Sequence, residues 1–168
     1  MWIVLEKEGT KYLLLSEKVL DKQQYHSENK SISWENCSLR KWLSDSFYSN
    51  AFSAAESRMI LSTEVLNADR GDYKGGNNTN DKVFLLSREE TTKYFSTDEK
   101  AAAEFTAYAN ALYKIDSNKW WRRSNEMLTV IDKVLGSALL YCADISTENK
   151  TFITSVQGVR PALWIEIE

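Results

Sequence analysis

The chain contains 168 residues, of which 43% are hydrophobic and 27% are charged, a composition that is typical of globular proteins and excludes an intrinsically disordered chain. A chain of this length can bury roughly two-thirds of its unfolded surface, so we expect residues 1–168 to form one domain. The formal net charge of -3 argues against nucleic acid as a partner, and no apolar run approaches the roughly 20 residues that cross a membrane, so no membrane insertion is expected.

Apolar runs at the N-terminus predict a β-hairpin. Residues 2–5 and 12–15 are hydrophobic and are separated by charged residues, with Gly9 at the turn. Residues 21–33 are mostly polar, which predicts an irregular connection between the hairpin and the next element.

The middle of the chain predicts helices. Four apolar residues recur at the spacing of one helical face: Leu39, Trp42, Leu43 and Phe47. A helix is therefore expected from Ser38, and the capping-box pattern of serine followed three residues later by glutamate marks further helix starts at Ser53 and Ser87. The helix after Ser87 should end near residues 94–95, and an apolar stripe predicts a last helix over residues 98–112.

Glycine, asparagine and aspartate dominate residues 67–81, which predicts the main mobile loop, because these residue types favour turns over packed elements. The apolar run of residues 83–86 predicts a buried strand after it. Rigid scaffolds usually carry recognition on loops, so residues 67–81 are where we expect a ligand to bind.

Strands are expected again towards the C-terminus, over residues 119–123, 128–132, 138–142, 152–156 and 159–167. Both ends of the chain are then apolar strands, and pairing residues 2–6 with residues 163–167 would satisfy the backbone groups of both. The sequence therefore predicts a single α+β domain with central helices and an antiparallel sheet that joins its N- and C-terminal strands.

The sequence contains no recognisable combination of residues for a common catalytic mechanism. The single histidine, His26, lies in a polar stretch, and the chain has no G-x-S-x-G turn, which argues against a Ser-His-acid hydrolase. No second histidine or cysteine lies three to five residues after His26, so we expect a solvated surface imidazole rather than a metal ligand. The sequence predicts neither an enzyme nor a bound cofactor.

Calcium is the one metal that the loop composition leaves open, because calcium takes six to eight oxygen ligands. Five side chains of the loop could supply oxygens: Asp69, Asp72, Asn77, Asn78 and Asp81. The same residue types gather in loops for conformational reasons alone, and Asp81 could instead pair with an arginine. The stretch over residues 75–80 lacks the Lys-Ser/Thr ending of a phosphate-binding loop.

Three arginines sit beside apolar strand residues: Arg122, Arg123 and Arg160. One of the two adjacent arginines should point inward, where an unpaired guanidinium would be strongly destabilising. The acids that could pair with it are Glu56, Asp81 and Glu90. An anionic or carboxylate ligand is the alternative partner, because a guanidinium can bind either in bidentate geometry.

Five tryptophans can organise the core or form a platform on which sugars stack: Trp34, Trp42, Trp120, Trp121 and Trp164. Only one of the adjacent pair can face the core of a one-sided sheet. We therefore expect Trp121 to be an exposed contact residue, with Tyr73 of the loop beside it.

The two cysteines, Cys37 and Cys142, have neither zinc nor redox spacing. Two half-buried free thiols are expected. A disulfide between them stays open and requires their Cα atoms to come within about 7 Å.

The motifs near the C-terminus resemble the ending of a bacterial domain family whose function is not established. WWRRS at residues 120–124 and GVRPALW at residues 158–164 are similar to WWLRS followed by GVRPALW, with Arg122 where the family usually has leucine. The resemblance continues upstream through residues 34–43, 51–56 and 81–90. A tryptophan-serine block followed by Val-Arg-Pro is also similar to the end of C-type-lectin-like domains, including those of formylglycine-generating enzymes.

These resemblances imply a C-type-lectin-like fold and a piece of a longer, secreted or surface-attached bacterial protein. Together with the missing catalytic set, they favour a non-catalytic binding module for carbohydrate or protein. The candidate ligand contacts are Asp72, Tyr73, Asn77, Asn78, Trp121 and Arg123. An enzyme similar to formylglycine-generating proteins, which would need two cooperating cysteines near the C-terminal strands, and a structural spacer remain the alternatives.

Overall fold

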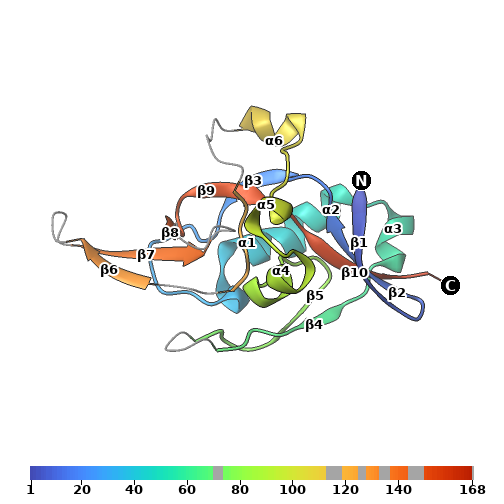
Figure 1. Cartoon of the computed structure of the whole chain (residues 1–168), viewed down its shortest axis with the longest axis horizontal. Helices are drawn as coiled ribbons and strands as arrows, with labels where there is room; N and C mark the ends of the chain where they lie inside the picture. Colours follow the sequence, from blue (N-terminus) through green and yellow to red (C-terminus); the bar gives the residue numbers. More distant parts are fainter. Residues whose placement is uncertain (70–73, 113–118, 125–127, 133–136, 144–149, 168) are drawn as a thin grey trace.

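The computed structural model describes residues 1–69, 74–112, 119–124, 128–132, 137–143 and 150–167, with the backbone alone for residues 98, 128–132, 137–143 and 150–151. It is a small α+β domain, as the sequence predicts (Figure 1). None of the helices among these residues is both long and apolar enough to cross a membrane.

The two ends of the chain meet in one antiparallel sheet, which confirms the predicted pairing of N- and C-terminal strands. Its order is β1 (Trp2–Glu8), β2 (Lys11–Ser16) and β10 (Ala162–Glu166). The predicted direct ladder between the first and last strands is wrong, because β10 pairs with β2 along its length. β2 is the more buried strand of the hairpin and takes the central place, whereas β1 is an edge strand with a register shift between Val4 and Glu6.

A second pair of strands joins the polar segment after the hairpin to the C-terminal part of the chain. β3 (Asp21–Gln24) pairs antiparallel with β9 (Val156–Val159). The prediction of an irregular connection over residues 21–33 is therefore wrong for its first four residues. Periodicity did not predict β3, because all four of its side chains are polar although two of them are buried.

One helical rod of three segments follows: α1 (Ser38–Trp42), the π-helix η2 (Leu43–Phe47) and α2 (Tyr48–Ala51). A 3-10 turn, η1 (Trp34–Asn36), precedes it. The predicted apolar face is confirmed, since Leu39, Leu43 and Phe47 are buried and Trp42 is half-buried.

Both predicted capping boxes are present. They start α3 (Ala54–Met59) and α4 (Arg88–Tyr94), where Ser53 and Ser87 each exchange hydrogen bonds with the glutamate three residues on. The predicted helix over residues 98–112 is instead two short helices, α5 (Asp98–Ala101) and α6 (Ala107–Leu112).

Residues 102–106 between these two helices are held open by an earlier segment of the chain. The backbone N–H of Val19 donates to Glu104 O at 2.9 Å, and that of Thr106 donates to Val19 O at 3.0 Å. These bonds replace helical ones and break the predicted helix.

Of the predicted mobile loop over residues 67–81, the last three residues form a strand, and residues 67–69 and 74–78 belong to no helix or strand. β4 (Thr63–Val65) pairs with β5 (Thr79–Asp81), and we call the segment from residue 63 to residue 81 the arm. The predicted strand at residues 83–86 is buried, but its only described ladder contact is the bridge between Phe84 and Ala162.

The remaining strands form a separate antiparallel sheet at the end of the molecule opposite the termini (Figure 1). They are β6 (Leu128–Asp132), β7 (Ser137–Ala143) and β8 (Lys150–Phe152). The first two match the predicted ranges closely, whereas the strand predicted over residues 152–156 is wrong, because residues 153–155 form a turn between β8 and β9. Residues 119–123 were also predicted to be a strand, but among the described residues they form no extended ladder; Trp120 makes a parallel bridge to Gly158, and the backbone N–H of Arg123 donates to Leu86 O.

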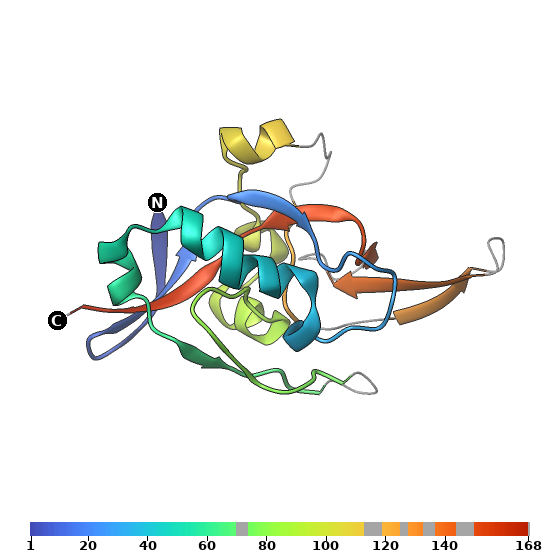
Figure 2. The same cartoon turned by 180° about the vertical axis from the view of Figure 1, so that it is seen from behind.

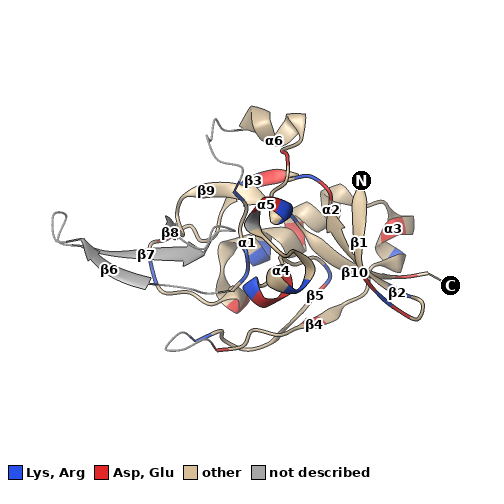
Figure 3. Ribbon diagram, viewed as in Figure 1, with Lys and Arg blue, Asp and Glu red and all other residues tan. Residues whose placement is uncertain are grey.

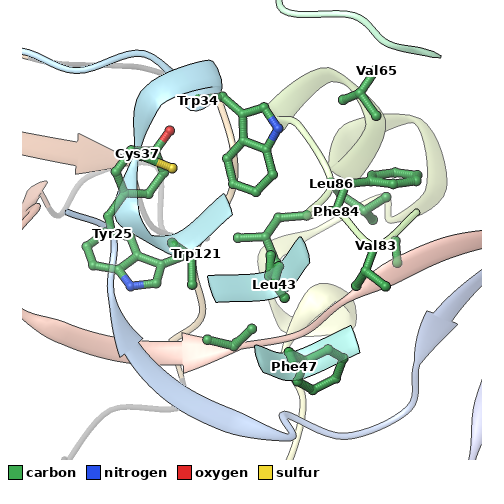
Figure 4. Close-up of a cluster of buried hydrophobic side chains, with 14 of the residues drawn as sticks. Tyr25, Trp34, Cys37, Leu43, Phe47, Val65, Val83, Phe84, Leu86 and Trp121 are labelled. Carbon is green, nitrogen blue, oxygen red and sulfur yellow. The ribbon is translucent and has the colours of Figure 1, made fainter. Parts of the chain in front are cut away.

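The core lies between two layers of helices. The 38–51 rod covers one side of β10, and α4 and α5 cover the other (Figures 1 and 2). At its centre the ring of Tyr25 contacts Trp34 and Trp121, with centroid distances of 6.4 Å and 5.7 Å (Figure 4). Cys37 is a buried free thiol, whereas the side chain of Cys142 lies outside the described part of the structure.

Candidate functional site

Two adjoining depressions lie along the 38–51 rod. The first has a volume of about 940 Å³ and is lined by His26 and by residues of η1, α1 and η2. The second has a volume of about 440 Å³, with β3, the rod and α6 around it and Tyr108 on α6. Trp42 and Ser46 line both, so the His26 depression and the Tyr108 depression adjoin at these two residues, and we call the two together the groove.

The π-helical turn shapes one wall of this groove. Within η2, Leu43 and Phe47 are buried, while Ser44, Asp45 and Ser46 are exposed and line the His26 depression. Isolated π-turns are rare and occur frequently at functional sites, because they re-aim side chains without ending the helix. Here the wide turn presents three consecutive polar residues to solvent.

Trp42 stands at the junction of the two depressions. Its ring contacts the buried ring of Phe47 at a centroid distance of 5.3 Å, tilted by 48°. Trp42 is half-buried as a whole and lines both depressions. An indole anchored in this way offers a rigid apolar face to a ligand at little cost in side-chain entropy.

His26 is buried at 7% exposure, so the expectation of a solvated surface imidazole is wrong. Its Nδ1 accepts from the backbone N–H of Ser38 at 3.2 Å and lies 2.7 Å from Ser38 Oγ. The imidazole thus caps the first turn of α1, and the proton of the neutral ring is on Nε2. Nε2 has no hydrogen-bond partner among the described residues, and burial lowers the pKa of the ring.

Asp81 pairs with an arginine, which confirms the alternative to calcium binding that was predicted for this residue. Arg40 donates from Nε to Asp81 Oδ1 at 2.8 Å, and its NH2 group lies 2.8 Å from the same oxygen. Trp34 Nε1 and Thr79 Oγ1 donate to Asp81 Oδ2 at 3.0 Å and 2.8 Å. This buried carboxylate fastens the arm to α1 and η1 and is saturated by protein donors.

Two of the loop residues proposed as ligand contacts, Asn77 and Asn78, are bonded to other residues of the protein. The Asn77 amide donates to the Glu35 carboxylate at 3.1 Å, and Asn78 Oδ1 accepts from the backbone N–H of Asn67 at 3.1 Å. Glu35 lines the His26 depression, so the arm borders that end of the groove. Asp72 and Tyr73 lie outside the described residues.

Of the oxygens considered as calcium ligands, those of Asp69 also accept hydrogen bonds within the arm. Asp69 accepts from Lys74 Nζ at 2.6 Å and from the backbone N–H of Gly75 at 2.9 Å. In the part of the chain that the structure describes, no group of three or more histidine, cysteine, aspartate or glutamate residues is arranged to hold a metal ion.

Trp121 is not the exposed contact residue that the sequence predicted. Both Trp120 and Trp121 have an exposure of 0%. Residues 119–123 do not belong to a one-sided sheet, and core lies on both of their sides. Trp121 Nε1 donates to Gln23 O at 2.8 Å, and Trp120 Nε1 donates to Ala101 O at 3.1 Å.

Arg123 is buried and pairs with Glu90, one of the three predicted partners. Its NH2 group donates to Glu90 Oε1 at 2.8 Å and to Leu66 O at 3.2 Å, and its NH1 group donates to Leu85 O at 2.7 Å. A smaller pocket of about 240 Å³ lies beside this pair, between the arm and α4. The guanidinium therefore joins the arm, residue 85 and α4.

The third arginine is also part of the scaffold. Arg160 donates to Ser16 O and Ala101 O, both at 2.9 Å, and its guanidinium lies over the rings of Phe95 and Trp120. Burial lowers its pKa to about 10. The two C-terminal motifs thus hold the core together.

A protein-family model matches residues 9–167, from the turn of the terminal hairpin to the residue after β10. The chain belongs to the DUF6273 family. The family is described as a domain of unknown function, which confirms the resemblance noted from the motifs. No curated protein and no solved structure matches this DUF6273 domain.

The groove was not predicted from the sequence. Its floor strand β3 is polar throughout, and its π-turn has no simple sequence signature. The spacing of Leu39, Trp42 and Leu43 did place Trp42 at the edge of the buried face, and this was the available signal.

Proposed function

We propose that this DUF6273 domain is a non-catalytic binding module whose ligand lies in the groove along the 38–51 rod. The observation that carries the proposal is Trp42, an anchored indole at the junction of two depressions whose other lining residues are mostly polar. Apolar contact surface with a few polar groups around it is the usual make-up of a ligand site.

The charges of the groove narrow the kind of ligand. In the His26 depression, the described lining residues include two acids, Glu35 and Asp45, and two bases, Arg40 and Lys41, so their formal charges cancel. Asp21 and Lys22 offset one another in the Tyr108 depression. Lysines, arginines and acids are also interspersed over the described ribbon (Figure 3). Such a surface favours a carbohydrate or a protein segment over a polyanion.

The wider setting that we propose is a secreted or surface-attached bacterial protein with a C-type-lectin-like fold. Support comes from the resemblance of residues 158–164 to the end of such domains and from the single sheet that joins the two chain ends. Cell fractionation should find the protein in the wall or medium fraction. An experimental structure should superpose its terminal sheet on those of C-type-lectin-like domains.

The binding function can be tested by screening the labelled domain on a glycan array and a peptide array. The key variant is Ser46→Trp, because Ser46 is exposed and lines both depressions, so the larger side chain fills the groove without entering the core. The matched control is Ser49→Trp, an exposed position on α2 that lines neither depression.

Saturable binding that Ser46→Trp abolishes and Ser49→Trp preserves is the expected result. Binding that both variants preserve would place the ligand elsewhere and overturn the proposal. A lack of binding on both arrays would also overturn it and would favour the structural spacer.

A further inference from the structure

We infer that the Tyr108 depression binds a neutral oligosaccharide, with sugar rings against Tyr108 and Trp42 and a hydroxyl group donating to Asp21. This inference rests on the proposed binding function and adds the class of ligand and its contacts. It concerns the half of the groove between α2 and α6, with β3 as the floor.

The two aromatic residues come from opposite sides of the depression. Tyr108 lies on α6 and is 62% exposed, and Trp42 lies at the end of α1. A pyranose ring has an apolar C–H face and hydroxyl groups around its edge. It can pack on an aromatic ring while polar side chains at the rim bind the hydroxyls.

Asp21 supplies the strongest polar signal. The residue is 8% exposed and lines the depression. Its Oδ1 accepts from the backbone N–H of Lys22 at 2.6 Å and from Gln23 Nε2 at 3.2 Å, whereas Oδ2 accepts no hydrogen bond from the described residues. Oδ2 therefore keeps acceptor capacity at the edge of the depression, and a ligand hydroxyl can donate to it in a charge-assisted hydrogen bond. Burial raises the pKa of Asp21, and the hydrogen bonds from Lys22 and Gln23 offset part of that effect.

The remaining wall is polar and carries little charge. Ser46 and Asn50 are exposed on the rod, and neither α2 nor α6 contains a charged residue (Figure 3). The ammonium of Lys22 lies 4.6 Å from the ring centre of Phe105, which does not line the depression. An anionic sugar would bring a second negative charge close to the Asp21 carboxylate, so a neutral glycan is favoured. The volume of about 440 Å³ lies within the usual range of small-ligand sites.

The test begins with the full chain on an array of neutral and uronic-acid glycans. The strongest neutral binder is then titrated by calorimetry and tryptophan fluorescence beside maltotetraose, cellotetraose and trigalacturonate. We expect saturable binding of a neutral oligosaccharide and at least tenfold weaker binding of trigalacturonate.

Three variants locate the binding. Tyr108→Ala should weaken it about tenfold, Tyr108→Phe should retain it because the ring stays, and Asp21→Asn should weaken it about 10- to 100-fold through the lost charged acceptor. Asn110→Ala, an exposed change on α6 away from the depression, should leave the affinity unchanged. Tyr108 is exposed, so its variants test the inference even if Asp21→Asn impairs folding.

Failure of this inference can be told apart from failure of the binding function. If only peptides bind, and Ser46→Trp abolishes that binding, the oligosaccharide is wrong and the binding module stands. Tighter binding of trigalacturonate, or glycan binding that Tyr108→Ala leaves intact, would also overturn the inference.

Discussion

Replacing Glu90 by alanine should remove the counter-ion of a buried arginine. The guanidinium of Arg123 is 2% exposed, and the side chain of Glu90 is 32% exposed. Removing one partner of such a pair costs about 3–5 kcal/mol, and we expect the lower end, because Arg123 keeps its bonds to Leu85 O and Leu66 O. The lost hydrogen bond from the Ser87 N–H adds about 1 kcal/mol.

The sum of about 4 kcal/mol corresponds to a fall in Tm of about 8–16 °C for a domain of this size. Urea and thermal unfolding followed by circular dichroism measure it. Glu56→Ala is the matched control, because Glu56 closes an equivalent capping box with Ser53 but forms no pair with a buried arginine among the described residues. The loss of stability in Glu56→Ala should therefore be clearly smaller than in Glu90→Ala.

The double variant Glu90→Ala with Arg123→Met completes the test. It should recover part of the loss, with a coupling energy of about 1–3 kcal/mol, because no uncompensated charge stays buried. Equal losses for Glu90→Ala and Glu56→Ala, or simple additivity in the double variant, would refute this account of the buried pair.

Three further outcomes are expected. Burial lowers the pKa of His26 from its usual 6.5, so protonation of this ring favours the unfolded chain. The free energy of unfolding should therefore fall as the pH drops from about 7 to about 5.5, and it should fall less in His26→Gln. Urea titrations at both pH values measure this difference. Burial raises the pKa of the Cys37 thiol to about 12, so peptide mapping should find it unlabelled by maleimide at about pH 8 until the chain is denatured. Gly75→Ala should lower Tm by several degrees, because the new Cβ would lie 2.0 Å from Asn67 O. Gly9→Ala has open space around its Cβ and should cost only about 1 kcal/mol of stability, for its φ of 60°. Equal losses of stability in the two variants would contradict this expectation.

Local patterns in the sequence predicted local structure well. Each capping box needs only a serine and a glutamate three residues apart, so both helix starts could be read directly from the chain. The apolar face of the 38–51 rod followed from periodicity. The cost of a buried charge indicated an acidic partner for one of the two adjacent arginines and placed Glu90 among three candidates, but it did not select the Arg123–Glu90 pair.

Predictions that depended on long-range partners were less successful. The backbone of Val19 breaks the helix expected at residues 98–112, and nothing within that segment reveals it. β3 is a strand because β9 lies beside it, although its side chains are polar. The exposure predicted for Trp121 assumed a one-sided sheet, and the fold instead buries residues 120–123 on every side. The candidate groove depends on these same long-range contacts.

The π-turn at residues 43–47 has a consequence for how this domain can vary. A π-helical turn accommodates one additional residue within a helix, so the helical segments before and after it keep the same side towards the core. Deleting a single residue among Ser44, Asp45 and Ser46 should therefore give an ordinary α-helical turn while Leu39 and Phe47 stay in the core. The length and chemistry of this wall can change by insertion or deletion, independently of the packing that holds the domain together.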